Sequence, residues 1–185
     1  MHIGKEYLFV DGYNIINSWD ELQKMAESSI EGARQELIDI MIEYQSYRDI
    51  NLIVVFDAYK VKGTTLRKEK YGRLEVIFTK ENETADTYIE RRLDEIGRIK
   101  KVTVATSDGM LQQMILSRGG LRLSAREFYH LVKDTEIEIE RKRKKISQNS
   151  INYRGTLDTG TLDKLRKLIE DEGQKKKKDN NGQAP

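Results

Sequence analysis

EYLFVDGYNIINSW, residues 6–19, begins with a short apolar run that ends in Asp11. An apolar run of this length is typical of a buried strand. Asp followed by Gly is also ordinary turn chemistry, so Asp11 taken alone is explained by a turn as well as by a metal site. Its role depends on what lies at the ends of the other predicted strands.

Strands and helices alternate along the chain. Further apolar runs predict strands over residues 51–57, 73–79, 101–108 and, more weakly, 119–124. Apolar residues recur at helical spacing over 31–47, 84–97 and 109–120, and a last helix is predicted from Ser124 into the basic stretch at 141–145. This alternation predicts an α/β fold with a mostly parallel sheet and helices on both of its faces.

Composition excludes several classes of site. The chain of 185 residues contains no Cys, which excludes disulfides, thiolate zinc sites and cysteine nucleophiles. It has no apolar stretch near the roughly 20 residues of a membrane span and no signal-like N-terminus, so we expect a soluble cytoplasmic protein without a membrane partner. The only histidines are His2 and His130, and we expect neither to be catalytic.

Positive charge is concentrated near the C-terminus. Residues 141–185 carry 13 Lys and Arg against 6 Asp and Glu, a net charge of +7, which leaves −5 for residues 1–140. We expect one globular domain over residues 1–145, and then an extension over 146–185 made of a linker, a short helix and a disordered basic tail. Basic runs such as RKRKK at 141–145 are either solvated surface or a phosphate-binding arm.

Carboxylates follow the predicted strands. Asp11, Asp57 and Asp108 end three of them, and Asp86 lies in the first turn of the helix after the third strand. Singly, each fits a turn, a cap or a favourable place in a helix dipole. Together they meet at the carboxyl edge of the sheet, where such folds bind ligands, and clustered carboxylates stay ionised only when cations or donors compensate them. Oxygen donors favour Mg²⁺ or Mn²⁺ over Zn²⁺.

An oxygen-ligated metal ion of this kind suits phosphoryl chemistry. It lowers the pKa of a bound water and neutralises the phosphate, so no side-chain nucleophile is needed. The sequence contains neither the G-x-x-x-x-G-K-[ST] loop nor G-x-G-x-x-G after the first strand, so we expect no nucleotide cofactor.

Four stretches, in this order, resemble a known family: LFVDGYNII (8–16), LIVVFDAY (52–59), ETADTYIE (83–90) and VATSDGMLQ (104–112). They resemble the NYN domain, a branch of the PIN-like nucleases, and most closely the bacterial YacP-like group. The resemblance covers roughly residues 5–145. It implies a three-layer α/β/α PIN-like fold and a metal-dependent endoribonuclease.

The resemblance also implies roles for individual residues. Asp11, Asp86 and Asp108 match the metal-site acids of the family, Asn14 matches the Asn that accompanies the first of them, and Asp57 matches the acid after the second strand. The YacP-like group includes an endoribonuclease that associates with ribosomes and cleaves mRNA during translation. The resemblance therefore implies mRNA as substrate and the ribosome as partner.

RNA contact is predicted separately for the basic segment 58–73. We expect it to be a loop whose cations bind phosphates and whose tyrosines stack on unpaired bases, although a solvated loop without RNA contact explains the same composition. The candidate RNA-binding residues are Lys60, Lys62, Arg67, Lys68, Lys70, Tyr71 and Arg73.

Two other classes of function share parts of this pattern. An RNA or ribosome binding module with a vestigial acidic edge would share every feature except turnover. A phosphoacceptor domain would need a paired acid at the first strand and a Lys after a late strand, and FVDGYN and LRLSAR supply neither.

Overall fold

A computed structural model describes residues 6–57, 66–96 and 100–155, with side chains up to residue 148. The chain divides into two compact units, Met1–Ile137 and Glu138–Pro185. No helix in the part of the chain described is both long and apolar enough to cross a membrane.

The first unit is built on one sheet. Its strands are β1 (Tyr7–Asp11), β2 (Asn51–Phe56), β3 (Arg67–Tyr71), β4 (Leu74–Phe78), β5 (Val102–Ala105) and β6 (Leu121–Leu123). They lie in the order β3-β4-β2-β1-β5-β6, and every neighbouring pair is parallel except β3 with β4. The predicted mostly parallel sheet is confirmed. The chain leaves β1 toward β2 on one side and reaches β5 on the other, so the strand order reverses beside β1.

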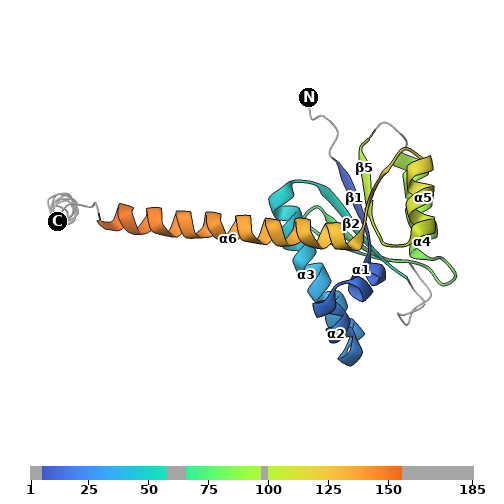
Figure 1. The fold of residues 1–185 in the computed structure, drawn as a ribbon, viewed down its shortest axis with the longest axis horizontal. Coiled ribbons are helices and arrows are strands. Elements are labelled where there is room, and N and C mark those ends of the chain that lie inside the picture. Colours follow the sequence, from blue (N-terminus) through green and yellow to red (C-terminus); the bar gives the residue numbers. More distant parts are fainter. Residues whose placement is uncertain (1–5, 58–65, 97–99, 156–185) are drawn as a thin grey trace, which may run out of the picture. The chain divides into compact units, whose positions relative to one another are not determined.

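Helices cover both faces of the sheet. They are α1 (Gly12–Ser18), α2 (Asp20–Ser28), α3 (Ile30–Arg48), α4 (Ala85–Ile96), α5 (Gly109–Ser117) and α6 (Ala125–Gly155). Residues of α1, α2, α3 and the start of α6 share one core cluster, whereas α4 and α5 belong to a second cluster on the opposite face (Figure 1). The predicted three-layer α/β/α architecture is confirmed.

The two-sided cover explains the composition of the central strands. In β2, Leu52 and Val54 pack into the first cluster, while Ile53 and Val55 pack into the second. Successive side chains of a strand point to opposite faces, so a strand between two helical layers must be apolar at every position. This requirement produces the unbroken run LIVVF that the sequence shows before Asp57.

Trp19 joins the first helices to the start of α6. Its indole Nε1 donates a buried hydrogen bond of 2.9 Å to the carbonyl oxygen of Ala125. Its ring lies 5.6 Å from the ring of Phe128 and 5.4 Å from that of Tyr129. Because buried aromatic rings contribute large apolar areas, this contact fixes the first turns of α6 on the core.

The structure corrects the expected loop over residues 58–73. Residues 67–71 form β3, an edge strand antiparallel to β4, and the loop prediction is wrong there. Gly72, at the turn between the two strands, has φ +61°, a conformation that favours glycine. Lys-rich edge strands discourage pairing with other chains, and four of the five residues of β3 are charged. Residues 58–65 lie outside the described part of the chain.

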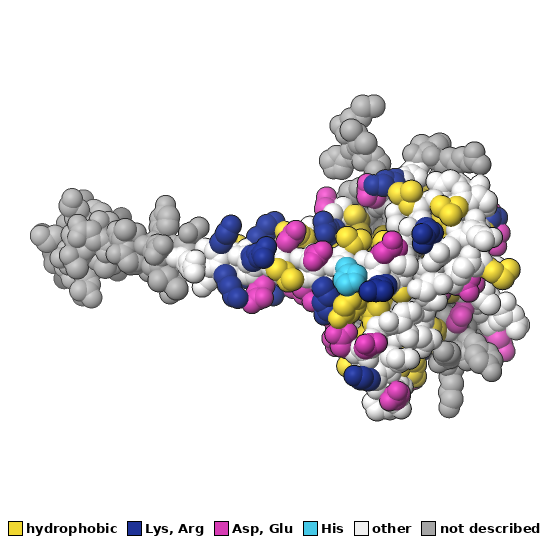
Figure 2. All heavy atoms as spheres, in the orientation of Figure 1, with side chains coloured by type: hydrophobic (Ala, Val, Ile, Leu, Met, Phe, Trp, Pro, Cys, Tyr) yellow, Lys and Arg dark blue, Asp and Glu magenta, His cyan; other side chains and the backbone are white. Residues whose placement is uncertain are grey.

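Other local predictions also need correction. Helices α1 and α2 were not predicted, because both are short and α1 follows β1 without a loop. Helix α6 continues to Gly155, into the segment 146–157 that was expected to be a linker. Along α6, Lys and Arg side chains are interspersed with Asp and Glu, as Figure 2 shows. The expected short helix and tail beyond residue 155 lie outside the described residues.

Candidate active site

Asp11 is the last residue of β1 and directly precedes α1. Its Oδ1 accepts a hydrogen bond of 3.2 Å from the backbone N–H of Asn14, so it serves as the N-cap of α1. Gly12 follows, and a Cβ on it would lie 2.3 Å from Cε1 of Phe56 at the end of β2. The chain can therefore pass from strand to helix beside Phe56 only with glycine at this position, and this passage places the Asp11 carboxylate at the edge of the sheet.

Asn14 and Thr106 connect this carboxylate to the end of β5. The side-chain Oδ1 of Asn14 accepts a hydrogen bond of 2.8 Å from the backbone N–H of Ser107. The hydroxyl of Thr106 donates to Asp11 Oδ2 at 3.4 Å and accepts from the backbone N–H of Asp108 at 3.1 Å. Thr106 is fully buried, so one hydroxyl joins the strand ends that carry Asp11 and Asp108.

Asp108 is the N-cap of α5. Its Oδ1 accepts hydrogen bonds from the backbone N–H groups of Met110 and Leu111, at 2.8 and 2.9 Å. Local backbone chemistry therefore accounts for this oxygen of Asp108, which accepts hydrogen bonds from the first turn of α5. The second carboxylate oxygen accepts no hydrogen bond from the residues described.

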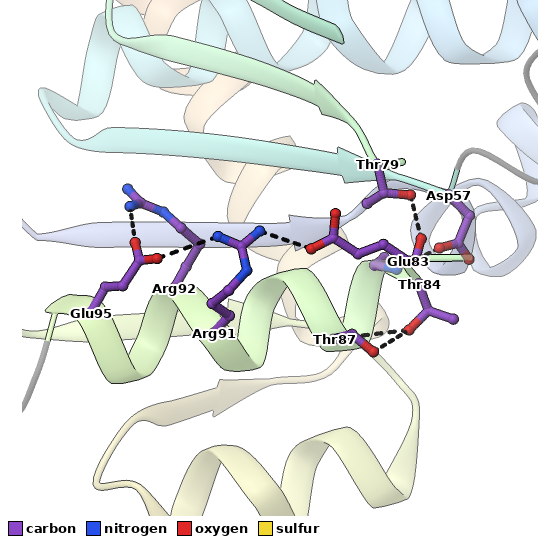
Figure 3. A network of polar contacts seen from close by, with 9 residues as sticks. Asp57, Thr79, Glu83, Thr84, Thr87, Arg91, Arg92 and Glu95 are labelled. Carbon is purple, nitrogen blue, oxygen red and sulfur yellow. Dashed lines mark hydrogen bonds and ion pairs between the residues drawn. The ribbon is translucent and has the colours of Figure 1, made fainter. Parts of the chain in front are cut away.

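Asp57 holds the start of α4, which carries Asp86. The Oδ1 of Asp57 accepts a short hydrogen bond from the backbone N–H of Ala85, the first residue of α4 (Figure 3). In the same network the Thr79 hydroxyl donates to the carbonyl oxygen of Glu83 at 2.5 Å, which closes the connection between β4 and α4. The ends of β2 and β4 thus jointly fix the position of Asp86 in the first turn of α4.

Burial and mutual repulsion act on the carboxyl groups. Burial raises the pKa of Asp11 to about 7; the hydrogen bonds from Asn14 and Thr106 oppose this rise, and the negative charges of Asp86 and Asp57 add to it. The pKa of Asp86 is also raised, first by partial burial of its carboxyl group and then by the charges of Asp108 and Asp57. Asp11 and Asp86 are thus both affected by the negative charges of neighbouring carboxylates, as expected for acids at the strand ends of one sheet.

These acids do not form a complete cage. Among the residues described, no group of three or more His, Cys, Asp or Glu side chains is gathered closely enough to hold a metal ion by itself. Mg²⁺ usually keeps several waters and binds through one or two carboxylates together with substrate phosphates. The oxygen-only donors at this edge suit such a partly protein-bound ion.

The predicted RNA-binding residues are distributed differently. Arg67 lies at the carboxyl edge, because it pairs in register with Phe78 at the end of β4. Tyr71 and Arg73 lie at the amino end of β4, and Arg73 forms an ion pair with Asp49 at the end of α3. The structure does not bring these two residues to the acids.

The remaining members of that set fall into two groups. Lys68 and Lys70 alternate with Arg67 along β3 and so project from the other face of the sheet. Lys60 and Lys62 lie outside the described residues.

The site also includes Thr106, Ser107 and Gln112, which were not predicted from the sequence. Gln112 Nε2 donates a hydrogen bond of 2.7 Å to the carbonyl oxygen of Thr106 and so supports the bridging residue from α5. The signal was present, because Thr106 and Ser107 directly precede Asp108 in the sequence. Small hydroxyl residues at a strand end commonly satisfy backbone groups, so their position beside an acid was informative.

Comparison with known proteins assigns a family. A family model, described as the YacP-like NYN domain, matches residues 8–170 of this chain. The chain belongs to this family. A Bacillus subtilis (strain 168) protein named YacP, described as uncharacterized, is 48% identical over 143 residues, which are 77% of this chain and 84% of that protein.

Two crystal structures of Rae1 (YacP) from Bacillus subtilis agree with this assignment. One matches with a TM-score of 0.69 and 39% identity over 97% of this chain and 99% of that chain. The other, of a mutant, matches with a TM-score of 0.68 and 44% identity over 77% of this chain and 84% of that chain. Membership of the YacP-like NYN family implies a nuclease-like fold, and the family match extends past residue 145, where the resemblance was expected to end.

Proposed function

We propose that this YacP-like NYN protein is a divalent-metal-dependent endoribonuclease that cleaves mRNA in the cytoplasm, in association with translating ribosomes. The observation that carries the proposal is the set of mutually repelling carboxylates at the carboxyl edge of the sheet, with the pKa of Asp11 raised to about 7. A buried carboxyl group beside other acids is stabilised in its charged form by a cation. Family membership supports the nuclease part of the proposal.

The residues proposed to hold Mg²⁺ or Mn²⁺ are Asp11, Asp86 and Asp108. All offer carboxylate oxygens, and Asp86 accepts no hydrogen bond from any residue described, so its oxygens are available to a cation or its waters. The ion would neutralise a phosphate and lower the pKa of a water molecule. No side-chain nucleophile is required.

The other residues of the site would act by positioning. Asp57 holds the N-terminus of α4 and thereby orients Asp86, in addition to its charge. Asn14 ties α1 to the end of β5 through Ser107, and Thr106 spaces Asp11 from Asp108. Preorganisation of this kind matters because small displacements of catalytic groups lower reaction rates strongly.

The test is Asp86→Asn. Asp86 belongs to neither core cluster, so it can be changed without disturbing the core. Loss of a metal-binding carboxylate should lower the cleavage rate by about 100-fold or more. The matched control is Asp94→Asn on the same helix, which removes a carboxylate paired with Arg118. Cleavage sites and rates would be mapped on mRNA with Mg²⁺ or Mn²⁺, with and without translating ribosomes. Full cleavage activity of Asp86→Asn would refute the proposed mechanism.

A second candidate function is an RNA or ribosome binding module without turnover. The observation that favours it is that, in the described part of the chain, no ready-made three-ligand metal group is found. The same experiment separates the two candidates. RNA or ribosome binding without metal-dependent cleavage, in both the presence and the absence of translation, would support the binding module.

A further inference from the structure

Two arginines pack on one phenylalanine at the carboxyl edge of the sheet. The guanidinium carbon of Arg34, from α3, lies 5.9 Å from the centre of the Phe78 ring, and that of Arg67, from β3, lies 5.4 Å from it. We call Arg34, Arg67 and Phe78 the arginine cluster. Phe78 is only 8% exposed, so the ring is a fixed platform for both cations.

This cluster is connected to the acids through neighbouring strands. Arg67 pairs with Phe78, and Phe78 pairs with Phe56, the residue before Asp57. The rings of Phe56 and Phe78 stack at 5.4 Å. Two strand spacings, roughly 10 Å, therefore separate the Arg67 backbone from the end of β2. An RNA strand lying across the acidic edge would reach Arg67 a few nucleotides from the bond that is cleaved.

The two cations differ in accessibility. The Arg34 side chain is 12% exposed, donates a hydrogen bond of 2.9 Å to the Tyr13 hydroxyl and pairs with Glu31 at 3.1 Å. The Arg67 side chain is 66% exposed and pairs with Glu69 on its own strand. An exposed ion pair contributes little stability, so a phosphate can compete with Glu69 for the planar donor fork of Arg67.

We propose that Arg67 binds a backbone phosphate of the RNA substrate outside the cleaved bond, while the Phe78 ring supports its guanidinium group. This inference rests on the proposed function. It also separates Arg67 from the lysines of β3: Lys68 pairs with Ile77 of the second core cluster, so its side chain projects from the other face of the sheet.

The experiment measures binding of a labelled single-stranded RNA by the full chain, in an Asp86→Asn background that prevents cleavage, over a series of salt concentrations. Arg67→Gln should weaken binding about tenfold, as for loss of a charged hydrogen bond. It should also reduce the salt slope by about 0.7, as for loss of one single-strand phosphate contact. Arg67→Lys should keep most of the slope.

Two comparisons make the test specific. Lys101→Gln breaks an exposed ion pair with Glu6 at the amino ends of the strands, away from the acids. It should leave the RNA affinity and its salt slope unchanged. Lys68→Gln should weaken binding less than Arg67→Gln does. Equal losses for Arg67→Gln and Lys68→Gln, no loss for Arg67→Gln, or no detectable RNA binding by the parent would each overturn the inference. If the Arg67 inference fails in one of these ways, the proposed function is still supported when the wild type cleaves RNA and Asp86→Asn does not.

Discussion

Replacing Asp11 with Asn tests how much the fold is destabilised by a charge at the end of β1. Asn is as good an N-cap as Asp, so the acceptor for the Asn14 N–H is kept while the charge is removed. Burial, together with Asp86 and Asp57, raises the pKa of Asp11 from 3.8 to about 7. At pH values between 3.8 and about 7, the Asp11 carboxyl group therefore keeps a proton in the folded protein that it has released in the unfolded chain.

The sign and size of the effect follow from this difference. Because the folded state binds more protons than the unfolded state, the contribution of Asp11 to stability falls as pH rises from about 4 to about 7. The rise in pKa corresponds to at most ~4 kcal/mol of unfolding free energy. We therefore expect Asp11→Asn to be more stable than the wild type by roughly 1 to 4 kcal/mol above pH 7, and nearly equal to it near pH 4.

The assay is urea unfolding of the full chain at about pH 4.5 and about pH 8, in a chelator so that no metal ion stabilises the carboxylate. The comparison of variant with wild type at each pH cancels the titration of the groups that do not interact with Asp11. Asp134→Asn, an exposed carboxylate on α6, controls for the loss of one negative charge. If Asp11→Asn changes stability equally at both pH values, the assigned burial and repulsion at Asp11 are refuted.

Three further predictions follow from the same edge of the sheet. Gly12→Ala should lower the unfolding free energy by about 2 kcal/mol or more, because the added Cβ would overlap the Phe56 ring. Gly109→Ala should not destabilise the protein, because no atom lies within 4 Å of the added Cβ, and equal urea midpoints for the two variants would contradict this prediction. Mn²⁺ at a hundred times its Kd should stabilise the wild type by about 2.7 kcal/mol in thermal melts, and Asp86→Asn should lose most of this gain; an equal gain in both would refute a role in metal binding. Asp57→Ala should cost about 1 kcal/mol by removing the acceptor at the start of α4, while Asp57→Asn retains it; equal losses in urea unfolding would contradict the cap.

The fold was largely predictable because its strands are buried on both faces. β1, β2, β4 and β5 are short apolar runs, and α3, α4 and α5 keep apolar residues on one stripe, so local pattern and tertiary environment agree. The edge strand β3 was missed for the converse reason. Its sequence RKEKY has no apolar alternation, and only pairing with β4 makes it a strand.

The candidate site was predictable in part. The sequence places Asp11, Asp57 and Asp108 at strand ends, and a parallel sheet necessarily brings such ends to one edge. The hydrogen bonds from Thr106 to Asp11 and from Ala85 to Asp57 join residues 95 and 28 positions apart, and no local pattern encodes them. The same limit applies to Arg34, whose contact with Phe78 depends on how α3 packs on the sheet.

The sequence by itself determined the layered α/β fold, the family, and which carboxylates follow the strands, because these depend on periodicity and on short motifs. Only the tertiary structure decided what each carboxylate does besides carry charge: Asp11 and Asp108 cap helices, and Asp57 holds the helix that presents Asp86. It also decided that Arg67, and not Tyr71 or Arg73, lies at the acidic edge. The physical reason is that strand register and helix packing fix the direction and burial of each side chain, and a linear pattern does not specify them.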